Sequence, residues 1–176
     1  MSKTGDGMFS EVSKEIHEST LKKLQLFDSI RGKDVRKLDI PFWDMVVITA
    51  VDDKQRTAYR LQIDAKVTRG ELPNGLIYEI VSDPQGTKIG NGGATLHAIE
   101  KLESIHGAEF LGGSKILMLH AGGFSQRLPS ASVLGKIFTA VPLGECGFTV
   151  FGTMHCRSNR VTAVVRQIWL RRELDL

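Results

Sequence analysis

Hydrophobic residues recur at helical spacing along the first thirty positions of the chain. From Ser10 onward they fall on one face of a helix, which is predicted to end near Gly32. The residues on or beside this face are Val12, Ile16, Leu21, Leu24, Phe27 and Ile30. The pattern predicts an amphipathic N-terminal helix that packs on the main domain. Residues 1–9, which are rich in glycine, serine and charge, are expected to form a disordered start.

Further along the chain, short apolar runs alternate with helical patterns. The runs that predict strands lie at residues 45–50, 76–81 and 116–119. The first is a continuous β-branched run, typical of a strand that is buried on both faces of a parallel sheet. Helical patterns separate the runs, one ending near Gly70 and the other at Gly107. This alternation predicts an α/β fold with a mainly parallel sheet in a three-layer arrangement.

In such a sheet, ligands bind at the carboxyl ends of the strands. The loops that leave this edge begin at Ala50, Ser82 and His120, and two of the three are glycine-rich. We therefore expect the functional site at this edge of the sheet.

The loop after His120 carries the residues that best fit a polyphosphate. Gly122 and Gly123 would let the main chain approach the phosphates closely, with N–H groups directed at their oxygens. Ser125 adds a hydroxyl donor. Arg127 offers a planar fork for two phosphate oxygens, and Lys136 supplies a second, more flexible cation. The alternative for Gly122 and Gly123 is a plain tight turn.

The second glycine-rich loop is a further candidate for phosphate binding. Gly92 and Gly93 stand at the start of a predicted helix, where free amides and the helix dipole attract anions, and Thr95 adds a hydroxyl. A structural turn explains these glycines equally well. The segment after His120 is not a Walker A loop, since Gly135-Lys136 lacks the Ser or Thr that follows the lysine in that motif. Metal ligands are left unassigned, because helix caps or turns account for each aspartate near a strand end, namely Asp52, Asp53 and Asp83.

Composition narrows the class of protein. The 176 residues are 41% hydrophobic and 24% charged, as expected of one globular domain without a membrane span. The polar, acid-containing start argues against a secretory or transit signal, so a cytoplasmic location is expected. Cys146 and Cys156 are expected to be reduced, incidental thiols. The net charge of +3 arises within residues 151–176, so no basic face for nucleic acid is expected.

Longer blocks of sequence carry a resemblance to a known family. Asp-Pro-x-Gly-x-Lys-Ile-Gly-Asn-Gly-Gly-x-Thr-Leu spans residues 83–96, and His-Ala-Gly-Gly-x-Ser-x-Arg-Leu-Pro opens residues 120–138, which end in Gly-Lys-Ile-Phe. These blocks resemble sugar-nucleotide pyrophosphorylases and, over roughly residues 15–144, fucose-1-phosphate guanylyltransferases. The resemblance implies an incomplete Rossmann-like nucleotidyltransferase sheet with an N-terminal amphipathic helix.

The same resemblance implies an activity and a set of roles. The reaction would transfer GMP from GTP to L-fucose 1-phosphate, giving GDP-L-fucose and pyrophosphate in fucose salvage, with Mg²⁺ as cofactor. Arg127 would stabilise the leaving pyrophosphate and Lys136 would reach the α-phosphate. The nucleotide-binding residues implied are Ala121, Gly122, Gly123, Ser125, Gly92, Gly93 and Thr95.

Beyond Gly144 the composition changes, because lysine gives way to arginine and both cysteines lie there. We expect residues 10–144 to be the N-terminal part of a nucleotidyltransferase domain and residues 145–176 a divergent tail, as an alternatively spliced form would give. Such a short form is expected to be weakly active or inactive. The alternatives are a non-catalytic nucleotide-binding fragment, a transferase for another sugar phosphate, and a fragment related to the fucokinase that is fused to this transferase in some organisms. The oligomeric state is left open.

Overall fold

The structure is a computed structural model that describes residues 5–86, 88–122 and 136–138, without the side chains of residues 5–10, 23 and 136. The elements are α1 (Gly5–Ile30), η1 (Val35–Lys37), β1 (Met45–Ala50), α2 (Asp53–Thr68), β2 (Ile77–Ser82), α3 (Gly90–His106), α4 (Ala108–Gly113), β3 (Ile116–His120) and η2 (Lys136–Phe138). The three strands lie within one residue of their predicted positions.

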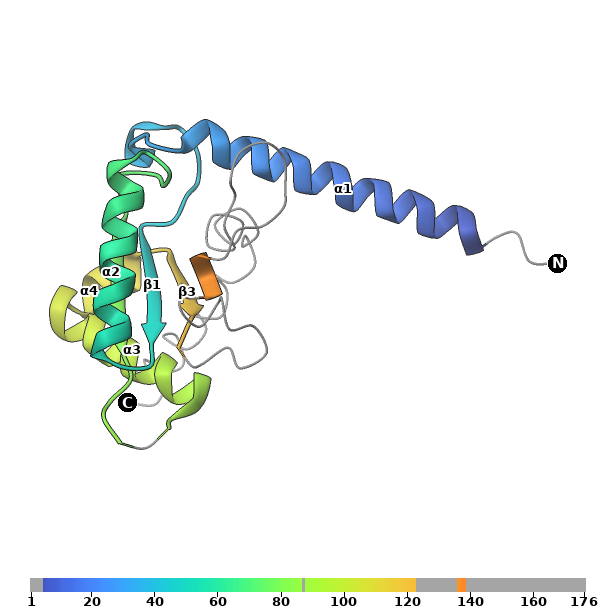
Figure 1. The fold of residues 1–176 in the computed structure, drawn as a ribbon. Coiled ribbons are helices and arrows are strands. Elements are labelled where there is room, and N and C mark those ends of the chain that lie inside the picture. Colours follow the sequence, from blue (N-terminus) through green and yellow to red (C-terminus); the bar gives the residue numbers. More distant parts are fainter. Residues whose placement is uncertain (1–4, 87, 123–135, 139–176) are drawn as a thin grey trace.

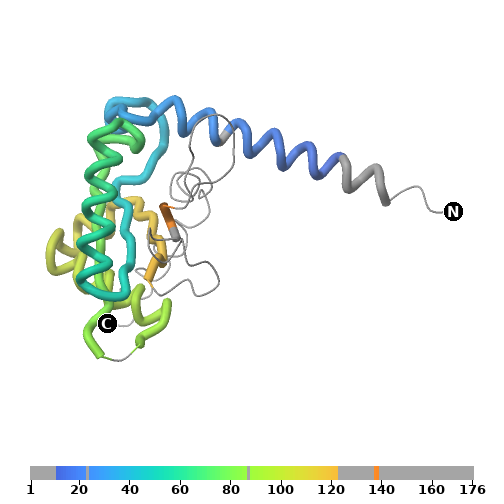
Figure 2. The backbone as a smooth tube through the Cα atoms, viewed as in Figure 1, coloured from blue at the N-terminus to red at the C-terminus, as the bar shows by residue number. Residues whose placement is uncertain are grey.

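The described strands form a parallel sheet with the order β2-β1-β3. Met45 at the start of β1 pairs with Ile77 on one side and Ile116 on the other. Helix α2 covers one face of the sheet, and α3 and α4 cover the other (Figure 1; Figure 2). The predicted α/β class with a parallel, three-layer arrangement is therefore confirmed.

Because β1 is central, all six of its residues are buried. The α2 face of the sheet packs into one hydrophobic core that also takes up the end of α1 and η2. On the opposite face, Met45 and Val47 pack with Ala98 and Leu102 of α3. The strand thus contributes alternate side chains to two separate cores, as the two-residue period of a strand requires.

The strand order places a switch point beside the central strand β1. The crossover from β1 to β2 runs through α2 on one face, whereas the crossover from β2 to β3 runs through α3 and α4 on the other. The first crossover leads from β1 to the edge strand β2, and the second returns past β1 to the opposite edge strand β3, so the switch point lies between β1 and β3. In an open α/β sheet, the crevice at such a switch point, beyond the carboxyl ends of the strands, is where ligands bind.

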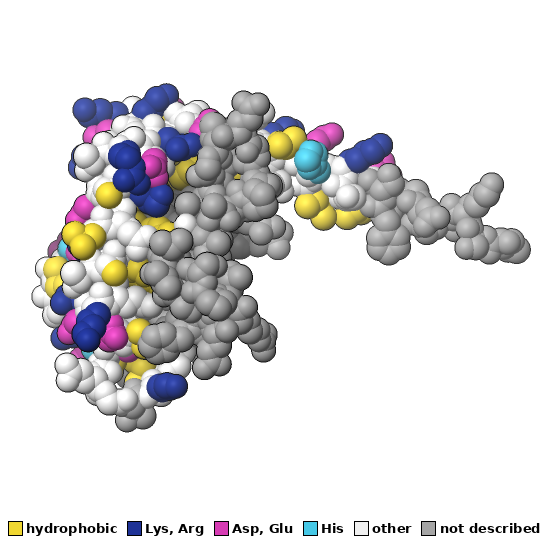
Figure 3. Space-filling model, in the orientation of Figure 1, with side chains coloured by type: hydrophobic (Ala, Val, Ile, Leu, Met, Phe, Trp, Pro, Cys, Tyr) yellow, Lys and Arg dark blue, Asp and Glu magenta, His cyan; other side chains and the backbone are white. Residues whose placement is uncertain are grey.

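Helix α1 projects away from the sheet (Figure 1). It begins at Gly5, within the segment expected to be a disordered start. Its last turns pack into the core through Leu24, Phe27 and Ile30, while Val12 and Ile16 on the projecting part are exposed. Figure 3 shows hydrophobic side chains on the surface of this projecting part. Within the described residues, no helix combines the length and apolar character needed to cross a bilayer.

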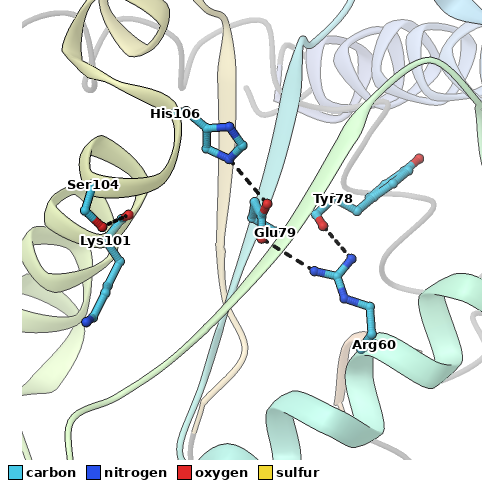
Figure 4. Close-up of polar contacts among 6 residues, drawn as sticks. All are labelled: Arg60, Tyr78, Glu79, Lys101, Ser104 and His106. Carbon is cyan, nitrogen blue, oxygen red and sulfur yellow. Dashed lines mark hydrogen bonds and ion pairs between the residues drawn. The ribbon is translucent and has the colours of Figure 1, made fainter.

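The outer edge of β2 is held by charged side chains from both helix layers (Figure 4). Arg60 of α2 donates a hydrogen bond of 2.7 Å to the Tyr78 carbonyl oxygen and pairs with Glu79 at 3.5 Å. On the other side, His106 of α3 lies 3.3 Å from Glu79. A groove of about 670 Å³ follows this edge between α2 and α3. Because its charges are largely paired with one another, we assign it no ligand.

An acidic residue at the turn after α2 gives a pH-dependent prediction. Arg69 and Lys66, which both bind the Glu71 carboxylate, lower its pKa to about 2. A depressed pKa stabilises the fold above the unfolded value of 4.5, and this stabilisation is lost as the pH falls toward 2. Glu71→Gln is therefore expected to lower the free energy of unfolding at neutral pH by less than about 1 kcal/mol, since the pair is partly solvated.

The measurement is urea unfolding of wild type and variant across the acid range. The stability gap between them should narrow steadily as the pH is lowered from about 5 to about 3. Glu100→Gln, at an exposed position of α3, serves as the matched control. A gap for Glu71→Gln that stays constant over this range would show that the carboxylate is not held by its two cations.

Candidate functional site

The loops after β1 and β3 touch at the carboxyl edge of the sheet, at the switch point. A Cβ atom added to Gly122 would lie 3.3 Å from the Val51 backbone nitrogen and 3.4 Å from the Ala50 carbonyl carbon. Glycine is therefore favoured at this position by the close approach of two backbones. This packing requirement is a second reason for Gly122, beside the phosphate contact that the sequence suggested.

The loop after β1 is fixed by a reciprocal set of hydrogen bonds at the start of α2. Asp52 accepts a hydrogen bond of 2.7 Å from the Gln55 backbone N–H. The Gln55 side chain in turn accepts one of 2.8 Å from the Val51 N–H. Asp52 is thus a helix cap, as expected for an acid at this position.

Ala121, the first residue after β3, is held from the α2 face. It is fully buried, and its carbonyl oxygen accepts a hydrogen bond of 3.0 Å from the Tyr59 hydroxyl. Burial raises the pKa of Tyr59 to about 12, so the hydroxyl keeps its proton and remains a donor near neutral pH. Helix α2 thereby positions the backbone that leads into Gly122.

The glycine-rich segment after β2 forms the first turn of α3. Gly90 adopts a φ of 65°, which a glycine tolerates readily. The N-cap residue of α3, Ile89, makes no side-chain hydrogen bond to the helix. Residues 90–92 are exposed, so the first turn of this seventeen-residue helix, whose amides have no acceptor within the helix, lies open at the ligand edge. Unpaired amides at a helix start favour an anion.

Gly92 and Gly93 differ in their surroundings. A Cβ atom on Gly93 would lie 2.6 Å from the Ile89 Cβ atom, whereas one on Gly92 would meet no atom within 4 Å. Gly93 is therefore required by packing, and the space beside Gly92 is open.

A histidine links this helix start to the strands. The Nδ1 atom of His120, the last residue of β3, lies 3.4 Å from the Thr49 hydroxyl, and its Nε2 atom lies 3.1 Å from the Thr95 hydroxyl. Thr95 also donates a hydrogen bond of 2.9 Å to the Asn91 carbonyl oxygen. His120 opens one of the sequence blocks described above, but the sequence alone suggested no role for it. The signal was present, since a polar side chain ending a buried apolar strand needs a partner.

The structure brings together five of the predicted nucleotide-binding residues. Ala121 and Gly122 lie at the switch point, and Gly92, Gly93 and Thr95 lie at the start of α3, which His120 joins to β3. Lys136 opens η2, but its side chain is outside the described residues. The remaining predicted site residues also lie outside the described part of the chain, namely Gly123, Ser125 and Arg127.

The described residues do not form a ligand set for the magnesium ion that the resemblance implies. No group of three or more His, Cys, Asp or Glu side chains suited to a metal is found in the described part of the chain. Asp52 caps α2, and Asp53 binds Arg56 at 3.1 Å and accepts a hydrogen bond from Ser82. Magnesium that accompanies a nucleotide is bound largely by phosphate oxygens and water, with one or two carboxylates, so such an ion requires no preformed protein cage.

Comparison with known proteins identifies relatives of the chain. The family model described as the fucose pyrophosphorylase domain matches residues 108–166, which extends past the boundary expected near Gly144. The fucose-1-phosphate guanylyltransferase of Mus musculus is 53% identical over 130 residues, which cover 74% of this chain and 22% of that protein. The enzyme of the same name from Homo sapiens is 51% identical over 130 residues, covering 74% of this chain and 21% of its own length.

A more distant relative has a second activity in its name. The bifunctional fucokinase/GDP-fucose pyrophosphorylase of Arabidopsis thaliana is 36% identical over 122 residues, which cover 58% of this chain and 12% of that protein. No solved structure matches the chain significantly. The chain spans about a fifth of the length of the mouse and human relatives. By sequence, the chain is therefore similar to the fucose-1-phosphate guanylyltransferases over 74% of its length, and its residues 108–166 match the model of the fucose pyrophosphorylase domain.

Proposed function

We propose that the chain belongs to the machinery that transfers GMP from GTP to L-fucose 1-phosphate, releasing pyrophosphate and forming GDP-L-fucose. The names of the relatives supply the reaction, and the substrates are carried to this chain as part of the proposal. The cytoplasmic location expected above is carried here as part of the proposal.

One structural observation carries the proposal. The loop that begins with Ala121-Gly122 and the exposed first turn of α3 both lie at the carboxyl edge of one parallel sheet, and the residues next to them, His120 and Thr95, are 3.1 Å apart. Both are backbone segments rich in N–H groups, and the first lies at the switch point where α/β sheets bind ligands. A polyphosphate that spans both segments is the ligand that such a pair of anion sites fits best.

In this scheme the protein acts mainly by positioning charge. Amides of Gly122 and Gly123, with the Ser125 hydroxyl, would bind phosphate oxygens, and the amides of residues 90–93 would bind a neighbouring group. Arg127 would offset the charge that gathers on the leaving pyrophosphate, and Lys136 would approach the α-phosphate. Holding attacking and leaving oxygens in line is the main requirement of phosphoryl transfer, because little covalent chemistry falls to the protein.

The proposal separates nucleotide binding from catalysis. Because the chain spans about a fifth of its enzyme relatives, we expect it to bind GTP with Mg²⁺ and to transfer GMP weakly or not at all. The experiment is incubation with GTP, Mg²⁺ and L-fucose 1-phosphate, with assay of pyrophosphate, alongside calorimetric titration with GTP and Mg²⁺. Binding without pyrophosphate release would favour a non-catalytic nucleotide-binding role. Absence of both would refute the proposed function for this chain.

Arg127 provides the sharpest test of the phosphate loop. A charge-assisted hydrogen bond contributes about 1.5–3 kcal/mol when shielded from water, so Arg127→Ala is expected to weaken GTP binding about tenfold or more. Calorimetry at constant ionic strength measures the change. Arg36→Ala is the matched control, since Arg36 is exposed and pairs with Asp34 beside the opposite end of the sheet. Equal affinities for the two variants would remove Arg127 from the site.

A further inference from the structure

We propose that His120 is a positioning residue for the nucleotide site, because its ring holds the glycine-rich start of α3 against the ends of β1 and β3. The inference rests on the proposed function. Beyond the residues proposed to bind phosphate, it assigns His120 the role of setting the spacing between the two phosphate-binding segments.

The placement of His120 follows from the strand register. Thr49 and His120 are Cα partners in the pairing of β1 with β3. Alternate residues of a strand lie on the same face of the sheet. Met45 and Val47 pack against α3, so the side chain of Thr49, two residues further on, also lies on the α3 face. Apolar packing between sheet and α3 therefore ends in a polar bridge, Thr49–His120–Thr95, at the ligand edge.

For the neutral ring, the hydrogen bonds favour one tautomer. The Thr95 hydroxyl has one proton, which it donates to the Asn91 carbonyl oxygen at 2.9 Å. It must therefore accept from His120, so the proton of the ring lies on Nε2. Nδ1 is then an acceptor for the hydroxyl of Thr49, which is 3% exposed and needs a partner.

The bridge has a direct consequence for the proposed phosphate site. Thr95 lies on the second turn of α3, next to the exposed amides of residues 90–92. His120 is followed immediately by Ala121 and Gly122. A single imidazole thus fixes the distance between the two backbone segments. Since His120 is placed between the sheet and α3, we assign it positioning and no contact with substrate.

The test removes the bridge and measures its effect with and without nucleotide. His120→Phe keeps a planar ring but loses both hydrogen bonds, and Thr95→Val keeps the shape of the side chain but loses its hydroxyl. His120→Gln retains an amide donor for Thr95 and is expected to recover part of the effect. Matched controls are His106→Phe and Thr68→Val, because His106 contacts Glu79 and Thr68 donates to the Asp64 carbonyl oxygen, both away from the ligand edge.

Without nucleotide, hydrogen exchange of the amides of residues 93–95, the first with acceptors inside α3, is expected to accelerate about tenfold in His120→Phe, while the amides of β1 keep their protection. With nucleotide, GTP and Mg²⁺ are expected to bind about tenfold more weakly at a temperature where all variants are folded. The double variant with Thr95→Val should bind no more weakly than His120→Phe alone, because both remove the same bridge.

The outcomes separate this inference from the proposed function. Unchanged exchange at residues 93–95 in His120→Phe would overturn the positioning role, whether or not GTP binds. If exchange is faster in His120→Phe but wild type binds no GTP, the bridge still stabilises the start of α3. That result would refute the proposed function and, with it, the role of His120 in a nucleotide site. Equal GTP affinity of wild type and His120→Phe would also overturn the inference.

Discussion

Tyr59→Ala is expected to lower the free energy of unfolding by about 3–5 kcal/mol, the usual cost of truncating a buried aromatic residue. Tyr59 is 2% exposed in the core between α2 and the sheet. Its ring meets Phe138 of η2 edge-on, with 5.5 Å between ring centroids. Truncation removes this contact and the hydrogen bond to Ala121 together. Urea unfolding, monitored by circular dichroism, measures the loss.

Two further variants separate the contributions at this position. Tyr59→Phe removes the hydroxyl alone and leaves the fully buried Ala121 carbonyl oxygen without that donor, which costs about 1–3 kcal/mol. Leu61→Ala, on the exposed side of the same helix, is the matched control and should change stability by no more than about 0.5 kcal/mol. A loss for Tyr59→Ala no greater than that of Leu61→Ala would contradict the packing of Tyr59 in this core.

Gly93→Ala is expected to destabilise the protein by about 1–3 kcal/mol through overpacking. The added methyl group would lie 2.6 Å from the Ile89 Cβ atom. That atom is attached to the backbone and cannot rotate away, so the first turn of α3 must move. Because this turn carries the exposed amides, GTP binding should also weaken. Thermal unfolding and calorimetry measure the two effects.

The neighbouring glycine provides the control for this prediction. Gly92→Ala adds the same methyl group one residue earlier, where no atom lies within 4 Å. Alanine has a higher helix propensity than glycine, so no loss of stability is expected. If both variants were equally destabilised, the loss would reflect glycine flexibility in the segment and not contact with Ile89.

The strands were predictable because each is a compact apolar run bounded by turn residues. The order β2-β1-β3 was not, since strand order depends on which crossover passes over which face. The short elements η1, α4 and η2 were also missed, because three to six residues carry too little periodicity to detect. Along α1 the apolar stripe was visible, but the sequence does not show which turns of the helix pack on the domain. In the structure, Leu24, Phe27 and Ile30 of the last turns lie in the core.

The location of the candidate site was predictable from the sequence, but the tertiary contacts that explain its residues were not. Glycines after strands indicated the carboxyl edge, and the structure places Gly122 and Gly93 there. Their contacts with Val51 and Ile89 depend on tertiary approach, which no local pattern reveals. The same holds for His120, whose partners Thr49 and Thr95 are 71 and 25 residues away along the chain.

The most direct test of the shared phosphate site is amide hydrogen exchange of the full chain with and without GTP and Mg²⁺. The account predicts added protection at residues 90–95 and at Ala121-Gly122 together, with none at the turn of residues 69–75 at the opposite end of the sheet. Protection of one glycine segment without the other, or at neither, would contradict the claim that both enclose a single polyphosphate.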